Sequence, residues 1–269
     1  MASAVPDARR PIMGVSTKMY FTLARTRSYV DELLTLLAAD ENKAIVDTMD
    51  VFVCPDAIAL PSVVEQVRAS SVPLLPGAQD CADEDYGAFT GFVSPAVLAD
   101  CGARLVEVGH AERRRLLGET DATTAAKARA AARNGLVPLV CVGELTRADG
   151  EVEASAAVAA ATVIAQIAPV LDSVPDDAEV LLAYEPVWAI GAAQPASAAY
   201  VRAVVSAIRD HSPAIRRRGA ARTRILYGGS AGPGLFAQLG GTVDGLFLGR
   251  FGHDPKQVLK TAHEIAGTK

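Results

Sequence analysis

The run EVLLAYE at residues 179–185 is apolar between two carboxylates, and a proline follows it at once. Apolar runs without polar alternation are typical of strands that are buried on both faces of a parallel sheet. Seven more short apolar runs recur along the chain, namely IMGVS (12–16), VFVC (51–54), VPLLPG (72–77), RLVEVG (104–109), LVPLVCVG (136–143), TRILYGG (223–229) and VDGLFLG (243–249). We therefore predict eight parallel strands.

Stretches with helical periodicity separate most of these runs, for example 28–37, 123–134, 152–171 and 198–211. Alternating strands and helices indicate right-handed βαβ units. Eight units in about 250 residues fit a (β/α)8 barrel, whereas a doubly wound sheet has fewer strands and a glycine-rich fingerprint that this sequence lacks. We predict an α/β fold with one (β/α)8-barrel domain over residues 1–269, in which residues 1–10 form a flexible extension.

Composition excludes several classes of protein. Half of the 269 residues are apolar, and the net charge of -5 argues against a nucleic-acid surface, which needs clustered Lys and Arg. The one dense basic run, 216–218, is interpreted as the solvated end of a helix. We find neither an uninterrupted apolar run of membrane-spanning length nor a signal peptide, and we expect a cytoplasmic protein without a membrane partner.

The four cysteines at 54, 81, 101 and 141 have neither metal-ligand spacing nor the density of a disulfide scaffold. We expect them to be reduced and mostly buried. No metal and no organic cofactor is expected.

In a (β/α)8 barrel the chemistry takes place at the carboxyl ends of the strands. The polar residues that follow the predicted strands are Lys18, His110, Glu144, Glu185 and Ser230. His110 precedes a predicted helix, whose positive N-terminal end disfavours protonation of the ring. Glu185 is desolvated by apolar neighbours, which strengthens it as a base, and residues 186–196 are interpreted as a mobile lid. Glu144 is expected to serve packing or a salt bridge.

Three motifs carry a specific resemblance: YEPVWAIG (184–191), GHAERR (109–114) and YGGS (227–230). They resemble the triosephosphate isomerase family, and further matches run from GVSTKM (14–19) to DGLFLG (244–249). The resemblance implies a TIM barrel and an intramolecular oxidoreductase of glycolysis and gluconeogenesis. Such an aldose–ketose isomerase converts dihydroxyacetone phosphate to D-glyceraldehyde 3-phosphate through an enediolate.

The resemblance also implies roles for individual residues. Lys18 supplies positive charge, His110 polarises the substrate oxygens and relays protons, and Glu185 moves the proton between carbons, as the corresponding residues do in this family. Glu112 supports the His and Lys side chains. The segment 79–92 resembles a loop that docks into a second subunit, so a homodimer is expected.

The phosphate is expected to bind backbone N–H groups in glycine-rich turns after the late strands. The residues expected to bind the substrate are Ser16, Lys18, Gly191, Ser230, Gly249 and Arg250. A guanidinium at Arg250 either binds the phosphate directly or points outward.

Some positions depart from the family pattern. Ser16 and Thr17 stand where the family has Asn and Trp, and Arg250 and Phe251 follow Gly249 where the family has another glycine. Shorter Ser16 leaves room in the pocket. These departures also resemble a side branch of the family that isomerises tetrulose phosphates such as L-erythrulose 1-phosphate, which is the alternative substrate. A lesser alternative is a catalytically silent barrel that only binds a sugar phosphate.

Overall fold

The computed structural model describes residues 10–192 and 195–267. Residues 1–9, which make up most of the predicted extension, lie outside the described residues. Arg10 is attached to the barrel, because its guanidinium forms an ion pair with Asp50 at 2.6 Å and donates to the Met49 carbonyl at 2.9 Å.

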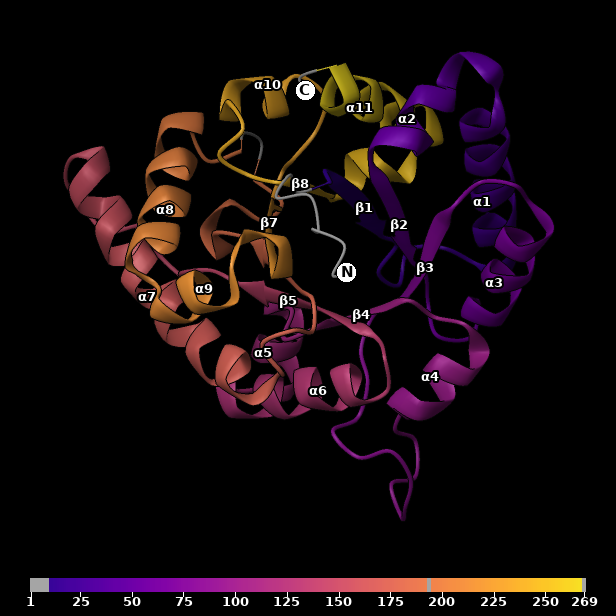
Figure 1. The fold of residues 1–269 in the computed structure, drawn as a ribbon, viewed down its shortest axis with the longest axis horizontal. Coiled ribbons are helices and arrows are strands. Elements are labelled where there is room, and N and C mark those ends of the chain that lie inside the picture. The colour runs from indigo at the N-terminus through magenta and orange to yellow at the C-terminus, as the bar shows by residue number, and fades with distance from the viewer. Residues whose placement is uncertain (1–9, 193–194, 268–269) are drawn as a thin grey trace, which may run out of the picture.

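The strands form one closed parallel barrel in chain order, with β1 paired to β8 (Figure 1). Their bounds are β1 (Ile12–Ser16), β2 (Asp50–Cys54), β3 (Leu74–Ala78), β4 (Leu105–Val108), β5 (Val137–Val142), β6 (Val180–Tyr184), β7 (Thr223–Tyr227) and β8 (Gly245–Leu248). The predicted (β/α)8 TIM barrel is confirmed, and each predicted apolar run overlaps one of the strands.

Helices surround the barrel as an outer ring (Figure 1). They are α1 (Leu23–Ala38), α2 (Lys43–Thr48), α3 (Leu60–Ala69), α4 (Pro95–Cys101), α5 (Ala111–Leu117), α6 (Asp121–Arg133), α7 (Val152–Ser173), α8 (Ala198–His211), α9 (Pro213–Arg218), α10 (Leu235–Leu239) and α11 (Pro255–Gly267). Four short 3-10 turns complete the described elements, namely η1 (Asp40–Asn42), η2 (Val187–Ala189), η3 (Ala220–Arg222) and η4 (Arg250–His253).

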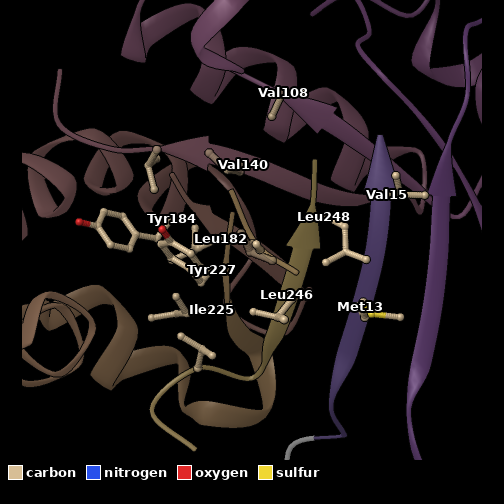
Figure 2. Close-up of a cluster of buried hydrophobic side chains, with 14 of the residues drawn as sticks. Met13, Val15, Val108, Val140, Leu182, Tyr184, Ile225, Tyr227, Leu246 and Leu248 are labelled. Atoms are coloured by element: carbon tan, nitrogen blue, oxygen red, sulfur yellow. The ribbon is translucent and has the colours of Figure 1, made fainter. Parts of the chain in front are cut away.

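The strand side chains alternate between two apolar cores, as the period of two in a strand requires. Outward-facing residues such as Val15, Val108 and Leu182 pack against the helices in the larger core (Figure 2). Inward-facing residues, including Leu105 and Leu181, fill the lumen of the barrel. Both faces of each strand are therefore buried, which explains why the strand sequences are almost continuously apolar.

Helix α7 is the one helix among the described residues that is long and apolar enough to cross a membrane by length and composition. It packs between α6 and α8 in the outer ring, and residues such as Val163 and Ile167 on its inner face are buried. Its alanine-rich sequence is that of a strong helix former. The position in the ring accounts for the apolar composition.

Candidate active site

The carboxyl ends of the strands open into one wide cleft. All residues predicted for the site line it, namely Ser16, Lys18, His110, Glu112, Glu185, Gly191, Ser230, Gly249 and Arg250. The barrel thus brings together residues that are up to 234 positions apart in the sequence, from 16 to 250.

Glu185 follows β6 directly, and its backbone N–H donates to the Val142 carbonyl of β5 at 2.8 Å. Its side chain is buried, and a Cβ at Gly228 would overlap the carboxylate, so only glycine fits there. Burial raises the pKa of Glu185 to about 7, an effect that the charge of Lys18 opposes and that of Glu112 reinforces. The carboxyl group is therefore a base that can accept and release a proton near neutral pH.

His110 caps the N-terminus of α5, where its Nδ1 accepts the backbone N–H of Glu112 at 3.2 Å. Because Nδ1 is an acceptor, the ring proton resides on Nε2, which lies 3.5 Å from Oε2 of Glu185. Burial lowers the pKa of His110 to about 4, and the charge of Lys18 contributes. A neutral imidazole therefore presents an N–H donor to the cleft beside the carboxylate.

Lys18 lies in the left-handed region with φ of 48°, which strains any residue except glycine. The side chain of Gln79 donates to the Lys18 carbonyl at 3.0 Å and to the Cys54 carbonyl at 2.9 Å, which fixes this turn. The Lys18 ammonium donates to Glu112 at 2.7 Å. Burial opposes the charge, but the hydrogen bond and charge of Glu112 prevail and raise the pKa of Lys18. Lys18 is a cation in the cleft.

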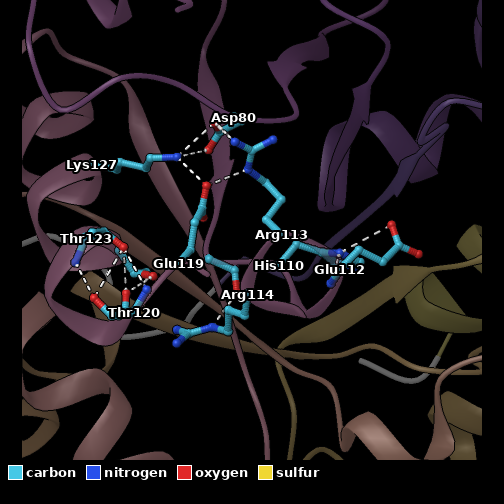
Figure 3. Close-up of polar contacts among 11 residues, drawn as sticks. Asp80, His110, Glu112, Arg113, Arg114, Glu119, Thr120, Thr123 and Lys127 are labelled. Atoms are coloured by element: carbon cyan, nitrogen blue, oxygen red, sulfur yellow. Dashed lines mark hydrogen bonds and ion pairs between the residues drawn. The ribbon is translucent and has the colours of Figure 1, made fainter. Parts of the chain in front are cut away.

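A network of ion pairs lies behind His110 and Glu112 (Figure 3). Glu119 accepts from Lys127 at 2.6 Å and from Arg113 at 2.7 Å, and Asp80 pairs with the same two cations. These contacts join α5 and α6 to the segment after β3. They therefore hold the turn that carries His110.

The predicted lid begins with η2, and its tryptophan is attached to the barrel. Trp188 Nε1 donates to the Glu144 carboxylate at 2.8 Å, and the Tyr200 hydroxyl donates to the same oxygen at 2.9 Å. Tyr184 adds a third hydrogen bond at 3.2 Å. Glu144 thus receives hydrogen bonds, and the expectation that it serves packing or a salt bridge misses this contact with the lid.

The other end of the cleft is formed by turns with exposed backbone. Gly191 has φ of 72°, a conformation that favours glycine, and Gly249 precedes η4. The Ser230 hydroxyl donates to the Ala192 carbonyl of the lid at 2.9 Å. Arg250 is exposed at the rim, and its guanidinium has no ion-pair partner among residues 10–192 and 195–267. These turns and Arg250 line the same end of the cleft.

Glu107 was not predicted as a site residue. It lies in the lumen on β4, only 3% exposed, and its Oε1 accepts a weak hydrogen bond from the Cys141 thiol at 3.8 Å. A glutamate inside the otherwise apolar run RLVEVG was the signal that could have identified it, because a charged residue is rarely buried without a reason.

Comparison with known proteins identifies the family. The sequence profile described as triosephosphate isomerase matches residues 11–265. The chain is 45% identical to the L-erythrulose-1-phosphate isomerase of Pectobacterium atrosepticum over 252 residues, which cover 93% of each protein. It is 41% identical to the protein of the same name from Brucella abortus over 88% of this chain and 90% of the relative. It is 40% identical to the triosephosphate isomerase of Pelobacter propionicus over 90% of this chain and 93% of that enzyme. The chain is an isomerase that belongs to the triosephosphate isomerase family.

Proposed function

We propose that this isomerase acts on a four-carbon ketose phosphate, L-erythrulose 1-phosphate, rather than on the three-carbon substrate favoured by the general family resemblance. The observation that carries the proposal is the 45% identity to a relative named for the tetrulose phosphate, compared with 40% and 36% for two relatives named triosephosphate isomerase. The short Ser16 at the wall of the cleft supports it, because the longer substrate needs additional space.

The chemistry of this substrate fixes the direction of the proton shift. L-Erythrulose 1-phosphate has its phosphate on C1, its ketone at C2, and a hydroxyl and one hydrogen at C3. Because C1 carries the phosphate ester, a shift of the carbonyl towards C1 would not give a free aldose. The proton therefore moves from C3 to C2, and the product is a second ketose whose carbonyl is at C3. No oxidant or second substrate is needed.

The side chains in the cleft can perform this shift. Glu185 removes the C3 proton, and the electron pair of the broken C3–H bond forms the double bond of a C2–C3 enediolate. The neutral His110 donates from Nε2 to the oxygens and relays a proton between them, while the Lys18 ammonium stabilises the negative charge. Glu185 then returns its proton to C2. The raised pKa of Glu185, about 7, suits a group that must both take and release a proton.

We expect the phosphate to bind at the turns after β6, β7 and β8. Gly191, Ser230 and Gly249 line this end of the cleft, where their backbone N–H groups are expected to bind the phosphate, and Arg250 lines it too and carries a positive charge. Anchoring the phosphate there directs the rest of the substrate towards His110 and Glu185. Remote binding of this kind orients the reacting carbons.

Steady-state kinetics of the purified protein test the substrate. We expect kcat/KM to be at least tenfold higher for L-erythrulose 1-phosphate than for dihydroxyacetone phosphate. Replacing Ser16→Asn restores the amide found in the family at this position and should reduce activity towards the tetrulose phosphate more than towards the triose phosphate. A preference for dihydroxyacetone phosphate in the wild-type protein would contradict the proposal, and activity on neither would favour a silent barrel.

We also propose that the chain forms a homodimer through the segment 79–92. This segment protrudes from the barrel between β3 and α4 (Figure 1). It carries three exposed aromatic side chains, Tyr86, Phe89 and Phe92, which are 71%, 45% and 65% exposed. Such a concentration of exposed apolar groups is typical of a surface that binds protein. Attachment at its base, where Arg133 pairs with Asp85 at 2.9 Å, keeps the segment in place for docking.

A further inference from the structure

Glu107 is a buried carboxyl group for which the proton transfer has no use. It lies in the lumen of the barrel directly behind two residues that line the cleft, Ser16 on β1 and Cys141 on β5. Its Oε1 accepts from the Cys141 thiol, its Oε2 is buried without a well-formed hydrogen bond among the described residues, and the Ser16 hydroxyl interacts with the same carboxyl group. An unpaired polar atom in a low-dielectric interior is costly, so its presence needs an explanation.

Burial favours the neutral form of Glu107. Burial raises the pKa of Glu107 to about 8, and the charge of Glu185 adds to the rise, whereas the Ser16 hydroxyl, the Lys18 ammonium and the Cys141 thiol oppose it. The fully buried Cys54 of β2 is its remaining titratable neighbour. A protonated carboxyl group can donate one hydrogen bond and accept others. Glu107 can therefore orient a neighbouring hydroxyl.

The expected orientation of the substrate also leads to Ser16 and Glu107. If the phosphate lies at the turns after β6, β7 and β8, the reacting carbons lie against His110 and Glu185, whose Nε2 and Oε2 atoms are neighbours at 3.5 Å. The end of the substrate furthest from the phosphate then reaches the wall formed by β1, β4 and β5. Ser16 is the hydroxyl on this wall, and Glu107 lies behind it.

We infer that Ser16 and Glu107 together form the subsite for the terminal hydroxymethyl group of the four-carbon substrate. The Ser16 hydroxyl binds the substrate hydroxyl, and Glu107 is a positioning residue that holds the Ser16 hydroxyl in the required direction. This inference rests on the proposed tetrulose phosphate substrate. It explains why a polar pair is buried where apolar side chains would be more stable, because a three-carbon substrate lacks the fourth carbon and the hydroxyl that this pair binds.

The test compares kcat/KM for L-erythrulose 1-phosphate and dihydroxyacetone phosphate in a set of variants. We expect Glu107→Leu to lower the tetrulose-to-triose ratio about tenfold or more, mainly through KM for the tetrulose phosphate, because a site that loses its hydrogen-bond partner discriminates less. Glu107→Gln, which retains both a donor and an acceptor, should keep the ratio within about threefold of wild type. Ser16→Ala should lower the ratio as Glu107→Leu does.

The double variant Ser16→Ala with Glu107→Leu separates positioning from packing. If Glu107 acts through Ser16, the ratio in the double variant should equal that in Ser16→Ala, because coupled residues are not additive. Cys54→Ala serves as the control, since Cys54 is buried in the same lumen but does not line the cleft. This variant should change kcat/KM for both substrates by the same factor.

The outcomes distinguish the two proposals. Wild-type activity on the tetrulose phosphate with an unchanged ratio in Glu107→Leu and Ser16→Ala would overturn this inference and leave the proposed substrate intact. A wild-type enzyme without activity on the tetrulose phosphate would overturn the proposed substrate itself. If Glu107→Leu does not fold, Ser16→Ala decides: a lowered ratio supports the subsite, and an unchanged ratio overturns it.

Discussion

At the scale of single residues, we expect catalysis to depend on one carboxylate, that of Glu185. Replacing Glu185→Gln removes the base but keeps the shape, and we expect kcat to fall by about 10²–10⁴-fold, the usual contribution of general acid–base catalysis. Glu185→Asp withdraws the carboxylate by one methylene and should cost about 10²-fold. Steady-state assays measure both. Glu179→Gln is the matched control, because Glu179 lies at the opposite end of the same strand; circular dichroism should show every variant folded. Activity of Glu185→Gln within tenfold of wild type would show that another group is the base.

The pH dependence of the reaction follows from the same residues. With a pKa raised to about 7, Glu185 is protonated below that pH and cannot accept the substrate proton, so kcat/KM should rise with pH through about 7. His110, with its pKa lowered to about 4, stays neutral over this range and adds no second rise or fall to the pH profile of kcat/KM. Phosphate monoesters titrate at about pH 6, so the rise in kcat/KM near pH 7 is distinguishable from the titration of the substrate phosphate. A plateau that extends down to pH 6 would contradict the assignment.

At the scale of elements, the lid is coupled to the barrel through Glu144. Trp188 is the only tryptophan in the sequence, so its fluorescence reports on the lid alone. In Glu144→Gln one amide oxygen replaces a carboxylate that accepts from three donors, and we expect altered Trp188 emission in the ligand-free protein and a several-fold change in KM. Emission spectra with and without substrate provide the measurement. Unchanged emission and an unchanged KM would show that this contact does not control the lid.

Local sequence patterns predicted most elements because strand burial and helix periodicity are visible in neighbouring residues. Parallel strands are buried on both faces, so their apolar runs stand out, and α8 begins and ends where the periodicity predicts, at Ala198 and His211. The pattern placed the start of α1 at residue 28, whereas the helix begins at Leu23. The reason is that Thr22 caps it, with its side chain accepting the Arg25 N–H at 3.2 Å.

Long-range contacts account for what the sequence did not show. The basic run 216–218 was interpreted as a solvated helix end, but Arg218 is buried and donates to the Val174 and Ala178 carbonyls at 2.9 and 2.6 Å. In the same way, the partners of Glu107 and Glu144 come from other strands and helices. Which side chains meet across the barrel depends on the register of strands far apart in the chain, which no local pattern records.

At the scale of the whole molecule, the segment 79–92 predicts the oligomeric state. Sedimentation equilibrium should give a mass of about twice the 28.0 kDa of the chain. Placing a charge on the exposed aromatic tip by Phe89→Asp should shift the protein towards monomer, because a charge buried without a partner is destabilising at an interface. The control Leu117→Asp changes an exposed residue, 64% accessible, on α5 outside this segment and should leave the mass unchanged. A monomeric wild-type protein would contradict the proposal.

The stability of the fold should depend on pH through Glu107. Its pKa is raised from 4.5 to about 8, so the folded protein favours the protonated form, and the resulting stability is complete below pH 4.5 and is lost as pH rises through 8. Glu107→Gln cannot ionise. Its melting temperature relative to wild type should therefore increase between pH 5 and 8, as measured by calorimetry. A constant difference over this range would show that Glu107 titrates normally.

The most direct test of the central claim is the identity of the product formed in D₂O, observed by ¹H NMR. A proton moved by Glu185 through an enediolate exchanges with solvent at the carboxyl group. We predict that L-erythrulose 1-phosphate gives a second ketose phosphate, with its carbonyl at the former C3 and one deuterium on the former C2. Formation of no ketose product, or of product without deuterium at that carbon over many turnovers, would contradict it.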